Sequence, residues 1–105
     1  EGKLSLEKLV SLTSLNAKKL FALQDKGVVV EGGHADLTFV DLKAEKTIEE
    51  DWLASRCGWS PFTGDRIKGW PVGTMVRGQR VMWEGQLETP ATGQPIAFVL
   101  KSPTI

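Results

Sequence analysis

The sequence is poor in the side chains from which catalytic centres are usually built. Its 105 residues include one histidine, His34, and one cysteine, Cys57, and these two lie far apart in the sequence. A catalytic zinc ion usually takes three protein ligands, and a nucleophilic cysteine needs an activating base and an oxyanion site. A single cysteine also rules out an internal disulfide and fits a reducing compartment. The composition therefore favours neither a zinc centre nor a catalytic thiol.

Excess charge and long apolar runs are also missing. Thirteen basic residues balance thirteen acidic ones, so strong long-range attraction to nucleic acid or to an anionic membrane is not expected. The longest apolar runs, such as residues 28–30, are far too short to span a bilayer. No basic region followed by an apolar stretch marks a secretory signal. We therefore expect a cytoplasmic protein with no nucleic-acid or membrane partner.

The length and the hydrophobic content of the chain suffice for one domain with a modest core. The hydrophobic fraction is 41% and the charged fraction is 25%, which are ordinary values for globular proteins. A chain near this length buries roughly two-thirds of its unfolded surface on folding. The first residue is Glu1 rather than methionine, as expected of a piece of a longer protein and also of a chain that has lost a leader.

The first 26 residues predict two short amphipathic helices. Ser5 is placed to cap the first helix. The second helix is expected over about residues 17–23, with Asn16 as its cap, and Gly27 suits the left-handed position that ends a helix. The apolar positions that define the two helices are Leu6, Leu9, Val10, Leu20 and Phe21.

Beyond Gly27, short β-branched and aromatic runs alternate with turn residues, a pattern typical of strands. Gly78-Gln79 forms a natural two-residue hairpin connection. Residues 50–56 indicate one or two helical turns, and residues 57–64 are too rich in glycine and proline for regular structure. The expected strands cover residues 28–30, 36–42, 46–48, 67–70, 73–77, 80–84 and 96–100. The predicted fold is α+β: two helices followed by a small, mainly antiparallel β sandwich or barrel-like domain.

Individual polar residues favour structural roles. His34 follows Gly32-Gly33, which predicts a solvent-facing histidine in a turn. Asp36 and Asp41 lie five apart on one expected strand and therefore point to opposite faces, which favours local hydrogen bonding over an acid/base pair.

The aromatic residues leave two interpretations open. Arg77 and Arg80 flank a hairpin near Trp83, but a stacking groove for single-stranded nucleic acid normally carries excess positive charge. That excess is absent, so a structural hairpin is favoured. The four tryptophans could line a ligand pocket or fill a small core or interface; they are Trp52, Trp59, Trp70 and Trp83.

Two stretches resemble a known family. Residues 26–41 read KGVVVEGGHADLTFVD. They resemble the segment by which metal-dependent amidohydrolases return from their last barrel helix to a small β domain: Lys-Gly, a short apolar strand, a glycine turn, then Ala-Asp-Leu and a strand closing on Asp. Residues 15–21 resemble the preceding helix, which usually holds an Asn-Pro-Ala-Lys sequence. Here Ala17 follows Asn16 directly, without the proline.

The second stretch points to one branch of that family. Residues 55–64 read SRCGWSPFTG, and residues 69–85 read GWPVGTMVRGQRVMWEG. They resemble the end of dihydroorotases, where Ser-Pro-Phe-x-Gly precedes a strand pair ending in Arg-Gly-x-x-Val. Hydantoinases, dihydropyrimidinases and allantoinases have related endings and remain as alternatives. A stand-alone, tryptophan-rich interaction module is a second alternative.

The resemblance implies a longer hydrolase, called the parent enzyme below, with a (β/α)₈ barrel and one or two zinc ions. It would interconvert dihydroorotate and N-carbamoyl-L-aspartate in pyrimidine biosynthesis. The family's metal ligands belong to barrel strands that would precede Glu1, and none maps onto this sequence, so no catalytic, cofactor-binding or metal residue is assigned. Residues 1–26 would be the terminal barrel helices and residues 27–105 the C-terminal part of the small β domain. The expected partners are the remainder of the barrel and further copies of the enzyme.

Overall fold

The computed structural model describes residues 2–88, 90 and 93–99. It begins with one continuous helical run, made of α1 (Leu6–Val10), a π-helical segment (Ser11–Leu15) and α2 (Asn16–Phe21). The prediction of two separate helices is wrong because Asn16 keeps helical dihedral angles, φ −68° and ψ −38°. The predicted cap is confirmed: the Oγ atom of Ser5 accepts a hydrogen bond of 3.1 Å from the backbone N–H of Lys8.

The helix ends earlier than Gly27. Ala22 adopts the left-handed conformation, with φ 52° and ψ 47°, and closes the helix. Gly27 also has a positive φ of 84°, but its role is a close approach to the helix. A Cβ atom at this position would lie 2.8 Å from the Cβ of Lys18. The glycine therefore lets the chain pass tightly against α2 after the helix has ended.

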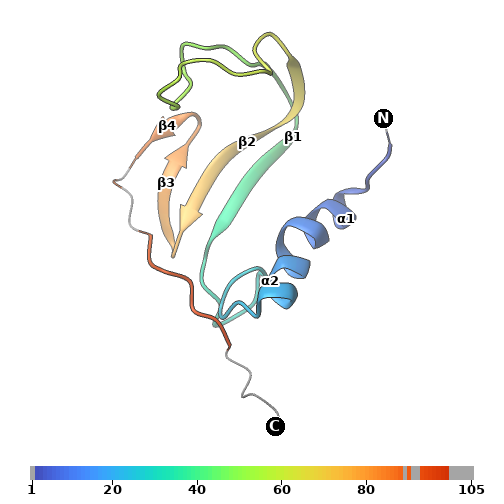
Figure 1. Ribbon diagram of the computed structural model, residues 1–105, viewed down its shortest axis with the longest axis vertical. Helices are drawn as coiled ribbons and strands as arrows, with labels where there is room; N and C mark the ends of the chain where they lie inside the picture. The colour runs from blue at the N-terminus through green and yellow to red at the C-terminus, as the bar shows by residue number, and fades with distance from the viewer. Residues whose placement is uncertain (1, 89, 91–92, 100–105) are drawn as a thin grey trace.

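Four strands form one antiparallel sheet in the order β1-β2-β3-β4 (Figure 1). The strands are β1 (Leu37–Thr47), β2 (Arg66–Val76), β3 (Gln79–Trp83) and β4 (Gln86–Leu87). The antiparallel character is confirmed, but the described residues form a single open sheet and neither a sandwich nor a barrel.

Two pairs of predicted strands are in fact single long strands. Residues 36–42 and 46–48 belong largely to β1, and residues 67–70 and 73–77 belong largely to β2. A shift of register between Asp41 and Glu45 absorbs the irregular pattern within β1. Bulges of this kind interrupt the alternation of side chains without ending the strand.

Both hairpins have two-residue turns with positive φ at each central residue. These residues are Arg77 and Gly78, with φ 49° and 82°, and Glu84 and Gly85, with φ 48° and 81°. This is the type I′ geometry that matches the twist of antiparallel strands. The first turn lies one residue earlier than predicted. The second was not predicted, although its Glu-Gly dipeptide resembles the Arg-Gly of the first.

The remaining segments depart from the predictions. Residues 28–30 lie in the connection between α2 and β1 and form no strand, and residues 50–56 form turns and no helix. The loop over residues 49–64 is closed at its base, where the N–H of Ile48 donates to the carbonyl of Asp65 and the N–H of Gly64 donates to the carbonyl of Ile48. Residues 96–99 are extended, with one antiparallel bridge between Leu23 and Phe98; Leu100, the end of that predicted strand, lies outside the described residues.

The described part of the chain contains no fully buried apolar side chain. Leu20, Phe21 and Val29 are 77%, 59% and 85% exposed. No Cα atom of the helical run lies within 8 Å of a Cα atom in the four strands. The modest core expected from the composition is therefore absent among these residues. None of the described helices is long and apolar enough to cross a membrane.

Candidate functional site

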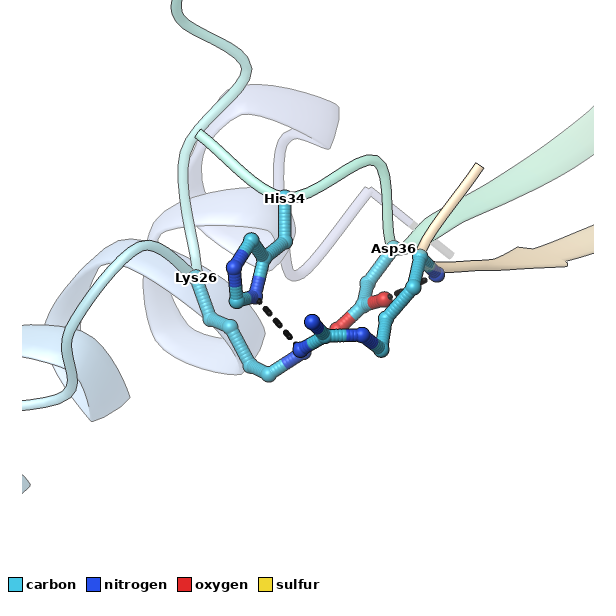
Figure 2. A network of polar contacts seen from close by, with 4 residues as sticks. Lys26, His34 and Asp36 are labelled. Carbon is cyan, nitrogen blue, oxygen red and sulfur yellow. Dashed lines mark hydrogen bonds and ion pairs between the residues drawn. The ribbon is translucent and has the colours of Figure 1, made fainter. Parts of the chain in front are cut away.

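The most concentrated group of polar side chains comprises Lys26, His34, Asp36 and Arg77, called the Asp36 cluster below. Figure 2 shows Lys26 and His34 on the connection that follows the helix, with the carboxylate of Asp36 just before β1. One carboxylate oxygen of Asp36 forms an ion pair with the ammonium of Lys26. The other accepts a hydrogen bond of 2.7 Å from the backbone N–H of Arg77 in the β2–β3 turn. Asp36 thus joins the connection between α2 and β1 to the β2–β3 turn, 41 residues later.

His34 also contacts residues on both sides of this contact between the connection and the β2–β3 turn. Its backbone N–H donates to the carbonyl of Asp25 at 2.7 Å, and its carbonyl accepts from the N–H of Asp36 at 3.0 Å. The ring Nδ1 atom lies 3.4 Å from a terminal nitrogen of Arg77. His34 is half-buried. The prediction of a solvent-facing histidine is therefore wrong.

The electrostatics of the Asp36 cluster favour a fixed charge. The hydrogen bond from Lys26 lowers the pKa of Asp36 below its ordinary value, and the backbone N–H of Arg77 lowers it further, while partial burial opposes both. A general acid or base works best when its pKa lies near the operating pH. A carboxyl group that is held ionised at neutral pH is suited to binding two donors, and this is the role that its geometry shows.

Asp41 belongs to a separate, local arrangement. Its Oδ1 atom accepts hydrogen bonds from the backbone N–H groups of Lys43 and Ala44, at 2.9 and 3.2 Å. These bonds stabilise the bulge in β1. The prediction of local hydrogen bonding is confirmed for Asp41 and is wrong for Asp36, whose carboxylate binds Lys26 and the distant backbone N–H of Arg77.

Cys57 is exposed in the loop over residues 49–64. Its Sγ atom lies 3.4 Å from the Oγ of Ser55 and 3.6 Å from the carbonyl of Trp59. The hydrogen bond with Ser55 lowers the pKa of the thiol, but neither contact is a general base. No group of three or more metal-ligating side chains occurs within residues 2–88, 90 and 93–99, so these residues do not fit a zinc ion.

The tryptophans form two separate contacts. Trp52 and Trp70 meet edge to face, with ring centroids 5.6 Å apart, and the ammonium of Lys46 lies 5.7 Å from the centre of the Trp70 ring. A groove of about 570 Å³ runs beside this pair. Its lining is mostly apolar: Lys46, Ile48, Trp52, Ile67, Gly69, Trp70, Pro71, Met82 and Gly85.

The second contact is between Trp83 and Arg80, and it accounts for the position of this arginine beside the hairpin. The guanidinium of Arg80 lies 4.8 Å from the centre of the Trp83 ring and forms a two-pronged ion pair with Glu88. The guanidinium of Arg77 instead lies near the ring of His34, within the Asp36 cluster. The two arginines are therefore engaged separately, which supports the structural interpretation of this hairpin. Sequence reasoning missed both partners, Lys26 and Glu88, because nothing local in the sequence links them to Asp36 or Arg80.

In the part of the chain that the structure describes, polar contacts of the Asp36 cluster join the connection after a helix to an open antiparallel sheet. Comparison with known proteins identifies the source of such a segment. The model of the amidohydrolase family matches residues 1–81. The chain belongs to the amidohydrolase family, and the resemblance described from its two sequence stretches is confirmed.

The curated relatives include dihydroorotases. The dihydroorotase of Pyrococcus furiosus is 36% identical over 96 residues, which are 91% of this chain and 23% of the relative. The dihydroorotase of Methanothermobacter thermautotrophicus is 36% identical over 87 residues, which are 83% of this chain and 20% of the relative. The chain thus spans less than a quarter of the length of these relatives.

The solved structures that resemble this chain include hydantoinases. The L-hydantoinase (dihydropyrimidinase) of Arthrobacter aurescens matches with a TM-score of 0.77 and 37% identity, over 84% of this chain and 20% of that protein. The dihydropyrimidinase of Brevibacillus agri NCHU1002 matches with a TM-score of 0.72 and 29% identity, over 82% of this chain and 19% of that protein. Sequence and structure therefore point to the same family.

Proposed function

We propose that this chain is the C-terminal portion of a dihydroorotase-like cyclic amidohydrolase and that it has a structural role there. The parent enzyme would reversibly hydrolyse dihydroorotate to N-carbamoyl-L-aspartate in the cytoplasm, a step of pyrimidine biosynthesis. The observation that carries this proposal is the 36% identity to a dihydroorotase over 91% of the chain.

The uncovered surfaces of the chain support a proposed division after residue 26. Residues 1–26 would be the end of the parent's barrel, and residues 27–105 would be part of its small β domain. A helix that is apolar on several sides is normally buried in a larger protein, and Leu20, Phe21 and Val10 are all at least half exposed here. A groove of about 620 Å³ between the helix and β1 is also lined mainly by apolar side chains. The parent's barrel would cover these surfaces.

The outer edge of β1 supports the same division. Within the described residues β1 pairs only with β2, so one row of its backbone donors and acceptors has no partner strand. Native proteins rarely leave an edge of this length uncovered. A further strand of the parent enzyme would complete the sheet.

Zinc is proposed for the parent enzyme alone. The described residues of this chain provide no group of ligands for it, so the residues that bind metal and transfer protons would lie in the barrel. The contribution of this chain would be to fix the connection after the last helix to the β2–β3 turn of the small β domain through the Asp36 cluster.

Two alternatives rest on specific observations. The parent could be a hydantoinase or dihydropyrimidinase, which the match to the L-hydantoinase of Arthrobacter aurescens favours; an allantoinase is a further member of this group. A stand-alone interaction module is favoured by the groove beside Trp52 and Trp70.

Exchange of segments between enzymes tests these proposals. The matching C-terminal segment would be replaced by residues 1–105 in two hosts, the dihydroorotase of Pyrococcus furiosus and the L-hydantoinase of Arthrobacter aurescens. Each truncated host and each host with its own segment restored would be assayed in parallel. We expect turnover of dihydroorotate to return in the first host and turnover of the hydantoin to stay near the truncated level in the second.

The other outcomes separate the alternatives. Recovery in the hydantoinase host alone would favour the hydantoinase branch. Loss of activity in both hosts, with both chimeras folded by circular dichroism, would contradict a structural role in this family and favour the stand-alone module.

A further inference from the structure

The helix ends on a residue that local preferences do not favour. Ala22 has φ 52°, a region in which a Cβ atom crowds the backbone and which glycine adopts far more readily. The next residues, Leu23 and Gln24, are good helix formers, and Gly27 is the natural stop. The local sequence therefore favours a helix that continues past Ala22. A strained conformation of this kind persists only where surrounding structure imposes it.

Two sets of bonds hold Ala22 in this conformation. One is local, from the N–H of Leu23 to the carbonyl of Lys18 at 3.0 Å, and the other comes from the end of the described chain. Residues 93–99, called the strap below, run from the region of β4 to the end of α2 (Figure 1). The N–H of Gln24 donates to the carbonyl of Ala97 at 2.9 Å, and the N–H of Val99 donates to the carbonyl of Ala22 at 2.8 Å. These bonds flank the antiparallel bridge between Leu23 and Phe98.

The docked strap and a longer helix exclude each other. In a continued α-helix each N–H donates to the carbonyl four residues earlier, so the N–H of Gln24 would turn to Leu20. The carbonyl of Ala22 would turn to the N–H of Lys26. Both groups are bound to the strap in this structure, and they cannot serve both arrangements at once.

The two arrangements also differ in the position of Lys26, which belongs to the Asp36 cluster. Lys26 lies four residues after Ala22 and forms the ion pair with Asp36. Winding residues 22–26 into the helix would rotate Lys26 away from Asp36. Because Asp36 also binds the N–H of Arg77, the state of the helix end is coupled to the β2–β3 turn.

We propose that the strap is a conformational switch: when docked it holds Ala22 in the left-handed conformation and Lys26 against Asp36, and when released it lets the helix extend toward Gly27. The sheet is held independently of the strap at Glu88, whose N–H donates to the carbonyl of Val81 and whose carboxylate pairs with Arg80. Detachment of the strap would therefore leave these contacts of the sheet intact. This inference concerns the internal mechanics of the chain and goes beyond the proposed hydrolase role.

The test follows the backbone of Ala22 by nuclear magnetic resonance in the full 105-residue chain. Val99→Pro removes the N–H that binds Ala22, and Ile96→Pro is the matched control, because the N–H of Ile96 makes no bond to residues 22–24. We expect the ¹³Cα and ¹³C′ shifts of residues 22–24 to move to helical values in Val99→Pro and to stay unchanged in the control. Adding Ala22→Gly should reverse the shift by favouring the left-handed conformation. Retention of the left-handed shifts in Val99→Pro, or a change to disordered values, would overturn the proposal.

A covalent clamp covers the case in which Val99→Pro fails to fold. Leu23→Cys and Phe98→Cys, combined with Cys57→Ser, place a disulfide across the bridge. Because strap release would be the route by which the amide of Gln24 exchanges with solvent, the oxidised clamp should slow that exchange at least about tenfold relative to the reduced form. Equal exchange in the two forms would refute the switch.

Discussion

The indole ring of Trp83 lies so close to Gly73 that a Cβ atom built on this glycine would sit 2.5 Å from two of the ring carbons. Gly73 pairs with Phe39 on one side and with Trp83 on the other, and the two aromatic rings meet edge to face at 5.4 Å. Gly73 is the one buried residue in the part of the chain that the structure describes. The absence of a side chain at this position allows two strands to carry large aromatic residues over the same point.

Gly73→Ala should therefore destabilise the sheet. The added methyl group meets a rigid ring, and overpacking of this kind costs about 1 to 3 kcal/mol. Urea unfolding followed by tryptophan fluorescence would measure the loss. Gly93→Ala is the matched control, since nothing lies within 4 Å of a Cβ atom at that position. Equal midpoints for the two variants would show that the ring moves aside without cost.

The Asp36 cluster predicts a dependence of stability on pH. The pKa of Asp36 in the folded state lies below its ordinary value of 3.8. The stabilisation from this group is therefore fully present above about pH 4 and is lost as the pH falls through the lower, folded-state pKa. Asp36→Asn should remove this contribution, flattening the pH dependence of unfolding in the acid range. Because Asp36 is exposed, the cost at neutral pH should be about 0.5 to 1.5 kcal/mol.

The control for this variant is Asp41→Asn, which changes a carboxylate that binds only neighbouring backbone groups. In the parent enzyme, turnover per folded molecule should stay near wild type in Asp36→Asn. Abolished turnover with an unchanged melting temperature would instead give Asp36 a catalytic role.

The sequence predicted best the features that depend on neighbouring residues. The cap at Ser5 and the two-residue hairpin near Gly78 arise from local hydrogen bonding and from backbone freedom, so they are visible in a short window. The helix was expected to end at about residue 23, with Gly27 as the left-handed residue that follows it. The structure ends the helix at Ala22, where local bonds to the carbonyl of Lys18 are joined by bonds to a segment more than 70 residues later.

The candidate site shows the same division. Local hydrogen bonding by Asp36 was predicted, but its pairing with Lys26 and its bond to Arg77 were not. The bond to Arg77 spans 41 residues. Sequence periodicity reports only on nearby residues, so it could not predict this contact. The strand expected at residues 28–30 failed for a related reason: β-branched residues favour extended structure, but a strand also needs a neighbour, and none lies beside this segment in the described residues.

The chain should bind no stoichiometric zinc. It has one histidine and one cysteine, and no group of three or more potential ligands occurs among the described residues, whereas a catalytic zinc ion takes three protein ligands. Plasma emission analysis after purification without chelators would measure the metal content. One tightly held zinc ion per chain would contradict this prediction, unless two chains were shown to share the ion.

Self-association is the last expectation, and it follows from surfaces that the chain leaves open. Leu20 and Phe21 on the helix are 77% and 59% exposed, and Val29 on the following connection is 85% exposed. Contiguous apolar patches larger than a few hundred Å² are rare on soluble monomers, and the uncovered edge of β1 invites pairing with another chain. In the absence of the parent's barrel, the simplest way to cover these surfaces is a two-fold dimer.

Light scattering after size exclusion should therefore show a dimer or a larger species for the isolated 105-residue chain. Leu20→Glu combined with Phe21→Glu should shift the population toward monomer, because a charge in the patch must lose its hydration when the patch is buried. Lys19→Glu, which changes the charge of a neighbouring exposed residue without altering the apolar surface, should leave the assembly unchanged. A monomer at high concentration that binds no dye specific for apolar surface would mean that the helix packs on its own sheet in solution. That result would remove the need for a barrel to cover the helix, and the stand-alone module would become the better account of the chain.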